Sequence, residues 1–167
     1  MAWSDPTANL TFSTAEVVTA AKMNLIRDDL IDLDRRTSPV AATVATSETT
    51  TSATYTDLAT TGPAATFTVG STGKLEVVLY SALSNNTTGD AADISFALSG
   101  ANTQAAAAAF SLTYGAFTGG ASQRQGATWL LTGLTGGSTT ATCKYERITG
   151  GTATFSDRKI VCTPFGS

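Results

Sequence analysis

The stretch Thr139–Ile148, "TTATCKYERI", decides the fold class of this sequence. Its side chains alternate in character, so that Ala141, Cys143 and Tyr145 fall on one face of an extended strand while threonine, lysine and glutamate fall on the other. A strand with one apolar and one polar face is typical of an antiparallel sheet that covers a core on one side. We therefore expect this end of the chain to be β-sheet.

Further strand-like segments fill the chain from Val40 onward, and short glycine-rich or asparagine-rich turns such as "NNTTGD" and "TGGS" separate them. The segments are Val40–Thr46, a stretch around Tyr55, Ala64–Gly70, Lys74–Ser84, Asp93–Gly100, Ala106–Tyr114, Gly126–Leu134, Thr139–Ile148, Thr152–Phe155 and Arg158–Phe165. This spacing predicts a mainly β protein with an antiparallel β-sandwich or jelly roll. We expect the sandwich to occupy residues 39–167 and a separate N-terminal region to occupy residues 1–38.

The segment Lys74–Ser84 carries apolar residues on both faces of its predicted strand. One face holds Leu75, Val77, Leu79 and Leu83, and the other holds Val78, Tyr80 and Ala82. A strand of this kind in a small sandwich needs a second cover, and a neighbouring subunit would supply it. On this interpretation a trimer buries surface of the Leu79 type that a monomer leaves exposed.

The run of five alanines from Ala105 to Ala109 is open to two interpretations. Alanine favours helix, yet five residues are too few to hold a helix alone, and the following "FSLTY" has the pattern of a strand. We interpret the run as strand, with a close contact between subunits as the reason for such small side chains.

One amphipathic helix is predicted within Thr14–Arg36, "TAEVVTAAKMNLIRDDLIDLDRR". Ser13 and Glu16 fit a capping box, and Thr19 fits a simple N-cap. We favour Thr19 as the start, because the two β-branched valines before it prefer an extended backbone. Pro39 then ends the helix.

The helix carries an apolar stripe of Met23, Ile26, Leu30 and Leu33 at spacings of three and four. A helix of about fifteen residues is marginal alone in water, so the stripe needs a partner. The partner is the chain's own β-domain, copies of the same helix in a short trimeric bundle, or a different protein. The extended arm before the helix adds further apolar anchors. The predicted anchoring and oligomerisation residues are Trp3, Phe12, Met23, Ile26, Leu30 and Leu33.

Charge and hydropathy exclude several classes of partner. Charged residues make up 14% of the chain and the formal net charge is -3, so no basic field is available to bind nucleic acid. No apolar run is long enough to insert in a membrane, and the first residues lack the pattern of a signal peptide. We therefore expect folding in a cytoplasm.

The chain has no histidine, which removes the commonest general base and the catalytic triads that depend on it. A glycosidase needs two carboxylates, but the acids of the β-region are few and scattered. They are Glu48, Asp57, Glu76, Asp90, Asp93, Glu146 and Asp157. We expect no enzymatic activity, no cofactor and no metal.

Three other features have a structural interpretation. The loop Ser84–Asp93 offers oxygen ligands for calcium at Asn85, Asp90 and Asp93, but it lacks the ligand order of an EF-hand and is read as a turn. Cys143 and Cys162 are expected to be buried free thiols, and Trp129 to pack in the core instead of stacking on sugar.

The run "EVVTAAKMNLIRDDL" resembles the N-terminal motif of small structural proteins of tailed bacteriophages and prophages. In that family a tryptophan near the start and a "T-A-x-x-x-N-x-x-x-D-x-L" helix precede a β-domain rich in threonine, glycine and alanine. The matching residues here are Trp3, Thr19, Ala20, Asn24, Asp28 and Leu30. The segments "VATSETTTSATYTDLATTGPAATFTVGSTGKLEVVLYSALSNNTTG" and "GGTATFSDRKIVCTP" are also similar to that β-domain.

The resemblance implies a non-enzymatic virion surface protein that is assembled in the bacterial host cytoplasm. We expect a homotrimer, held by its N-terminal segment to major capsid or tail proteins, in the role of a capsid decoration or head-fibre protein. The alternative is a minor tail or tail-fibre protein, or a module at the tail that binds a glycan of the host surface.

Overall fold

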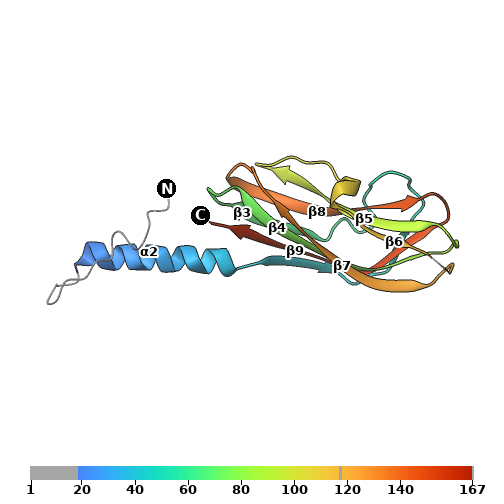
Figure 1. Ribbon diagram of the computed structural model, residues 1–167, viewed down its shortest axis with the longest axis horizontal. Coiled ribbons are helices and arrows are strands. Elements are labelled where there is room, and N and C mark those ends of the chain that lie inside the picture. The colour runs from blue at the N-terminus through green and yellow to red at the C-terminus, as the bar shows by residue number, and fades with distance from the viewer. Residues whose placement is uncertain (1–18, 117, 167) are drawn as a thin grey trace.

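The computed structural model describes residues 19–116 and 118–166, without the side chains of residues 29 and 31–37. Two antiparallel sheets pack face to face, and one helix extends from an end of this sandwich (Figure 1). The elements in chain order are α2 (Ala20–Thr37), β1 (Val40–Val44), β2 (Glu48–Thr50), β3 (Ala64–Val69), β4 (Lys74–Asn85), β5 (Ala91–Gly100), the 3₁₀ turn η1 (Ala108–Phe110), β6 (Leu112–Gly115), β7 (Ser122–Leu131), β8 (Gly137–Ile148) and β9 (Ala153–Phe165). The predicted fold class is therefore confirmed.

The strand order identifies the sandwich as a jelly roll. One sheet has the order β1-β9-β4-β7, with β2 also paired to β9, and the other has the order β3-β8-β5-β6. Successive long strands alternate between the two sheets, which is how two interlocked Greek keys wind around a single core. Every ladder that joins these strands is antiparallel.

The interior between the sheets is apolar and closely follows the predicted alternation. Ala141, Cys143 and Tyr145 of β8 are fully buried, and the side chains between them are half-buried on the outer face. On β4, Leu79 is buried inside the sandwich with 0% of its surface exposed. The expectation that a monomer leaves Leu79 exposed is therefore wrong. The outer face of β4 carries half-buried Val78 and Tyr80 instead.

Strand β9 joins two segments that the sequence pattern separates. Its register against β4 slips by one residue between Tyr80 and Ala82, and Asp157 there has a φ of 49°. The extra residue is a β-bulge, and it shifts which residues face inward. Phe155 faces the core on one side of the bulge and Arg158 on the other. This change of phase is why Thr152–Phe155 and Arg158–Phe165 look like two strands in the sequence.

Residues 51–63, here called the strap, are not the strand predicted around Tyr55. The strap runs beside β8, to which Thr56 pairs by two backbone hydrogen bonds with Tyr145, of 3.0 and 2.9 Å. The Tyr145 hydroxyl donates to the Gly62 carbonyl oxygen at 2.7 Å. One isolated backbone bridge and the Tyr145 hydroxyl therefore hold this segment, where the sequence predicted a regular strand.

The alanine run is also not a strand, contrary to expectation. Ala105–Ala107 form a loop and Ala108–Phe110 a 3₁₀ turn, and the strand begins only at Leu112. The Ser95 hydroxyl of β5 lies 2.9 Å from the Ala107 carbonyl oxygen and accepts from the Ala107 N–H at 3.2 Å. These bonds to a side chain replace the ladder bonds that a strand would make.

Candidate functional site

Helix α2 begins directly after its N-cap residue, Thr19. Thr19 has extended backbone angles, its hydroxyl accepts from the Lys22 N–H at 3.4 Å, and its carbonyl accepts from the Met23 N–H at 3.1 Å. The prediction that Thr19 is the N-cap is confirmed. The helix ends at Thr37, with Ser38 as C-cap, because Pro39 disfavours helical geometry in the residue before it.

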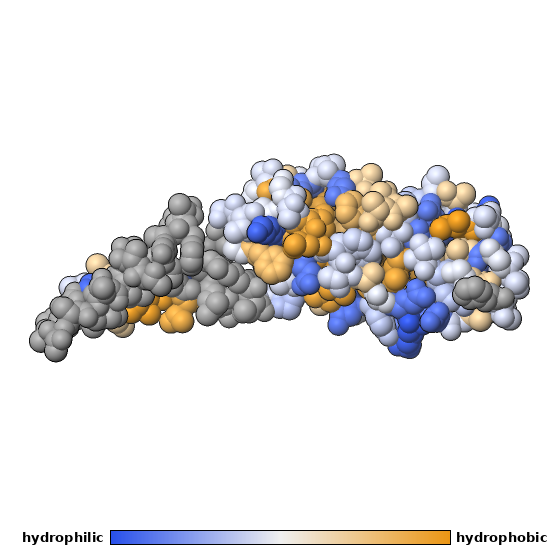
Figure 2. Space-filling view, in the orientation of Figure 1, coloured by the Kyte–Doolittle hydropathy of each residue, from blue (hydrophilic) through white to orange (hydrophobic). Residues whose placement is uncertain are grey.

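Two of the three described side chains of the apolar stripe of α2 are open to solvent. Met23 is 55% exposed and Leu30 is 60% exposed, while Ile26, between them on the stripe, is half-buried. Leu25, which lies off the stripe, is 41% exposed. Figure 2 shows hydrophobic atoms on the part of the helix that is not grey. Covering such large apolar side chains with a partner lowers the free energy, so this surface favours association.

Three of the predicted anchoring residues lie outside this description. Trp3 and Phe12 precede the described residues, and Leu33 is in α2 but its side chain is not described. Met23, Ile26 and Leu30 are brought together on one helical surface, as the spacing predicts. Arg27 forms an ion pair with Asp28 at 3.0 Å, and both side chains are more than 60% exposed, so this pair adds little stability.

The helix projects beyond the sandwich along the long axis of the molecule and meets it at β9 (Figure 1). Of residues 20–28 and 30, only Lys22 and Ile26 are half-buried, and the others are exposed. The end of β9, where Phe165 is 36% exposed, lies beside the junction. The described face of the stripe is therefore not covered by the chain's own sandwich.

A second notable group is the cluster in which Tyr55 of the strap covers Asp93 of β5. The Tyr55 hydroxyl donates to one Asp93 carboxylate oxygen at 2.7 Å, and Thr113 donates to the other at 3.1 Å. Asp93 is 1% exposed and lies directly opposite Glu146 in the ladder between β5 and β8. Burial, together with the hydrogen bond to Asp93, raises the pKa of Tyr55 above its ordinary value.

The bulge of β9 turns Arg158 into the interior, where it is 0% exposed. Its guanidinium forms an ion pair with Glu48 at 3.0 Å, donates to the Thr46 carbonyl oxygen at 3.2 Å and lies 5.3 Å from the centre of the Tyr145 ring. Glu48 also accepts from the Thr60 hydroxyl at 2.6 Å, and this bond, more than the cation, lowers the pKa of Glu48. The group ties β2 and β9 to the strap.

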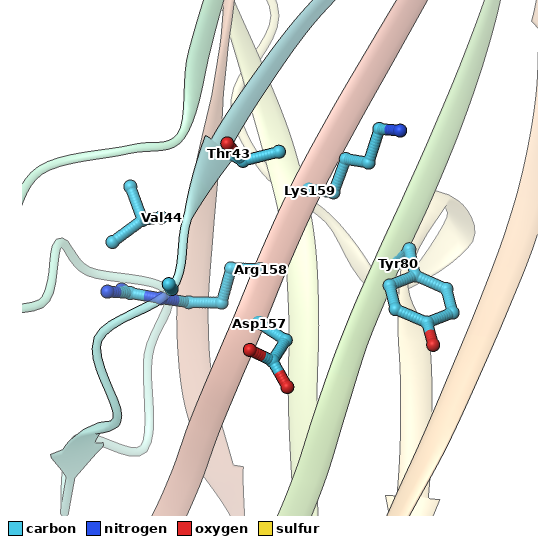
Figure 3. Close-up of a pocket in the computed structure, with 7 residues that line it drawn as sticks. Thr43, Val44, Tyr80, Asp157, Arg158 and Lys159 are labelled. Carbon is cyan, nitrogen blue, oxygen red and sulfur yellow. The ribbon is translucent and has the colours of Figure 1, made fainter.

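A shallow pocket of about 180 Å³ lies on the outer face of the β1-β9-β4 part of the sheet. Its lining residues are Thr43, Val44, Ala45, Tyr80, Asp157, Arg158 and Lys159. In Figure 3 the Arg158 side chain extends away from Tyr80 and Lys159, toward the break between β1 and β2. Asp157 is engaged by Arg124 in an ion pair of 2.5 Å. The pocket therefore presents Tyr80 and Lys159 but no acid free to act with them.

The carboxylates of the β-region are mostly engaged separately. Asp57 pairs with Lys144 at 2.8 Å, and Asp90 accepts from Thr149 at 2.6 Å. Asp93 and Glu146 are the pair that the fold brings side by side, but Asp93 is sealed beneath Tyr55, which leaves no room for a sugar ring between them.

The loop after β4 is a turn held by its own side chains. Asn85, which is fully buried, donates to the carbonyl oxygens of Ala91 and Gly150 at 3.0 and 3.1 Å and accepts from the Thr87 N–H at 3.0 Å. Its oxygen does not converge with those of Asp90 and Asp93, which bond to other partners. Within the described ranges, no three acidic or cysteine side chains gather as a metal site would require.

The two cysteines belong to the core, as predicted, and Trp129 packs against it from the edge. Trp129 is half-buried, and its ring centroid lies 6.1 Å from that of Phe96. Cys143 and Cys162 are free and fully buried. Burial raises the pKa of each thiol to about 12. In the part of the chain that the structure describes, no helix has both the length and the apolar character of a membrane span.

No protein-family model and no curated protein matches the chain. Among solved structures, the chain is similar to the VP2 subviral particle of infectious bursal disease virus, with a TM-score of 0.43 and 11% identity over 78% of this chain and 34% of that one. It is also similar to dimeric latent PorU from Porphyromonas gingivalis, with a TM-score of 0.37 and 13% identity over 75% of this chain and 13% of that one. The chain thus spans about a third or less of either protein, and the jelly roll is assigned from its own strand order.

Proposed function

We propose that this protein is a non-enzymatic structural component of the surface of a tailed phage particle. In this proposal the N-terminal region, residues 1–38, joins three copies of the chain and holds them to capsid or tail proteins. The jelly roll of each copy then projects outward. The resemblance of the N-terminal motif to phage virion proteins supports this assignment, and so does the division of the molecule into a closed sandwich and a helix on which Met23 and Leu30 are largely exposed.

The exposure of the apolar stripe is the observation that carries the proposal. Met23 and Leu30 are each more than half exposed, whereas the sandwich has its own core of fully buried large side chains. Covering an apolar side chain of this size contributes about 1.5–3 kcal/mol. Copies of the same helix, with Met23, Ile26 and Leu30 facing one another, supply that cover in a short bundle.

A capsid decoration or head-fibre role is the one we favour on the particle. A compact jelly roll on a helix of 18 residues is a short projection, suited to a capsid surface more than to a long tail fibre. Its outer faces carry short threonine side chains, of which Thr66 and Thr140 bond at 2.7 Å across neighbouring strands.

The test is to introduce a charge on the stripe and follow both assembly and folding. Ile26→Asp and Leu30→Asp are expected to abolish oligomer formation and incorporation into particles, while the circular dichroism of the sandwich is unchanged. Ala21→Asp places the same charge in the same helix but off the stripe, and should assemble normally. Unfolding of the sandwich in the two stripe variants would show instead that the helix completes its own core. Density for the wild-type chain on capsid lattice points, as opposed to the tail, would test its position.

A further inference from the structure

The outer face of the β5-β8 pair places two acids against each other beneath the strap. Asp93 and Glu146 are directly opposed in an antiparallel ladder, where side chains on the same face are close neighbours. Asp93 is 1% exposed and Glu146 is half-buried. Like charges in this arrangement repel each other, and the repulsion is stronger where water is excluded.

The strap is fastened at the same place. Tyr55 of the strap donates a hydrogen bond to Asp93, and the next residue, Thr56, pairs through its backbone with Tyr145. A tyrosine hydroxyl has a single proton to donate. That proton is engaged by Asp93 at 2.7 Å, while Glu146 lies close enough for the same hydroxyl to stabilise its charge. With both acids ionised, two anions thus compete for one donor.

The other charges around Glu146 do not remove this competition. On its own strand, Lys144 is paired with Asp57 of the strap at 2.8 Å. Arg147 donates from Nε to the Thr51 carbonyl oxygen at 2.7 Å, and its Nη1 bonds to the Thr149 carbonyl oxygen. From β5 the facing group is Asp93 itself. On the side of Asp93 away from β8 lie two neutral groups, Ser111 just before β6 and Thr113 in β6.

The folded state therefore favours a proton on Glu146. Burial first, and then the charge of Asp93, raise the pKa of Glu146 above the ordinary glutamate value of 4.5. A raised pKa means that the folded chain binds the proton more readily than the unfolded chain, so this contribution to stability increases as pH falls from neutral toward that ordinary value.

We propose that Glu146 is a proton-operated latch, which holds the strap more tightly over β5 and β8 in mildly acidic solution than at neutral pH. When Glu146 takes up a proton, its repulsion of Asp93 disappears and Tyr55 donates to Asp93 alone. The neutral carboxyl also gains an O–H that can donate to its neighbours. The strap therefore closes as pH falls, in the direction opposite to ordinary acid unfolding.

The Thr56 amide reports on the latch directly, because its hydrogen bond to the Tyr145 carbonyl oxygen breaks when the strap lifts. Its hydrogen-exchange protection factor, measured by NMR on the whole chain and corrected for the intrinsic pH dependence of exchange, should rise about two- to fivefold between pH 7 and pH 5. In Glu146→Gln the protection should be high at both pH values and should not change between them.

The matched control is Glu76→Gln, because Glu76 also lies within a long strand but is paired with Thr163 and Leu130 across its ladders. This variant should keep the wild-type response of Thr56. If Glu146→Gln does not fold, Asp93→Asn removes the same repulsion from the other side. It also weakens the anchor of the strap, because an amide has one acceptor oxygen where the carboxylate has two, so Thr56 protection should be lower than in the wild type but should not change between the two pH values. Protection of Thr56 that is constant with pH in the wild type, or a response that persists in the folded variant, would overturn the proposal.

Discussion

Helix α2 and the jelly roll treat their apolar side chains in opposite ways. The jelly roll buries Phe96, Phe155 and Ile160 completely, whereas the helix leaves Met23 and Leu30 more than half exposed. Both arrangements arise from regular patterns in the sequence, of period two in the strands and of three and four in the helix. The apolar side chains of the strands pack against one another within the same chain. Most of the described apolar side chains of the helix are not covered by the sandwich.

This difference separates the two tasks that we assign to the molecule. The sandwich has a closed core, an internal ion pair and a fastened strap, so its stability should be independent of other copies. The helix has 18 residues, and most of its described apolar side chains are exposed, so we expect it to be stable only when another surface covers it. Damage to one region should therefore leave the task of the other largely intact.

The largest effect on stability is expected from the core of the sandwich. Phe155→Ala removes a fully buried ring whose centroid lies 4.9 Å from that of Tyr145, and the cavity should cost about 3–5 kcal/mol of unfolding free energy. Urea denaturation followed by tryptophan fluorescence measures this loss. Leu30→Asp, examined in the same way, should leave the sandwich transition unchanged. An equal loss in both variants would mean that the two regions form one cooperative unit.

A smaller effect is expected where the strap is fastened. Tyr55→Phe removes the hydroxyl that donates to buried Asp93, and loss of a hydrogen bond to a charged group costs about 1.5–3 kcal/mol. Combining Tyr55→Phe with Asp93→Asn gives a double-mutant cycle for the pair. We expect the sum of the two single losses of unfolding free energy to exceed the loss measured in the double variant. Strictly additive losses would show that the bond contributes nothing of its own.

The acid sensitivity of the sandwich should depend on Glu48. The Thr60 hydroxyl and Arg158 lower the pKa of Glu48, so its contribution to stability is present above the ordinary glutamate value of 4.5 and is lost as pH falls below it. In Glu48→Gln the unfolding free energy should therefore fall less steeply with acid than in the wild type. Denaturation curves between about pH 6 and pH 3 measure both slopes, and identical slopes would contradict this role for Glu48.

The smallest effect concerns the cysteines, which should be chemically silent in the folded protein. With a pKa raised to about 12 by burial, neither Cys143 nor Cys162 presents a thiolate at pH 8. An aromatic disulfide reagent should label both thiols in urea and neither without it. Rapid labelling of the native protein would show that the sandwich opens readily, which its closed core does not suggest.

Much of this fold could be predicted from the sequence because alternation and turn residues are local signals. The alternation in Thr139–Ile148 gave the inner face of β8, and Thr19 gave the start of α2. The alternation failed where a bulge shifted its phase, as at Asp157. It also failed where side chains replaced ladder bonds, as at the strap and the alanine run.

The long-range pairings could not be predicted, because they join residues far apart in the chain. Arg158 looks like an ordinary surface cation in "DRKIV", and only the bulge turns it toward Glu48. Asp93 and Glu146 belong to two different predicted strands, and only the register of β5 and β8 places them side by side. For the helix, the spacing of apolar residues predicts the stripe of Met23, Ile26 and Leu30 but does not identify the surface that would pack against it.

The mass of the intact protein in solution tests the central claim most directly. Sedimentation equilibrium of the wild-type chain at micromolar concentration should give three times the mass of one chain, and Leu30→Asp should give a folded monomer. A wild-type protein that is wholly monomeric at that concentration would contradict the role that we assign to α2.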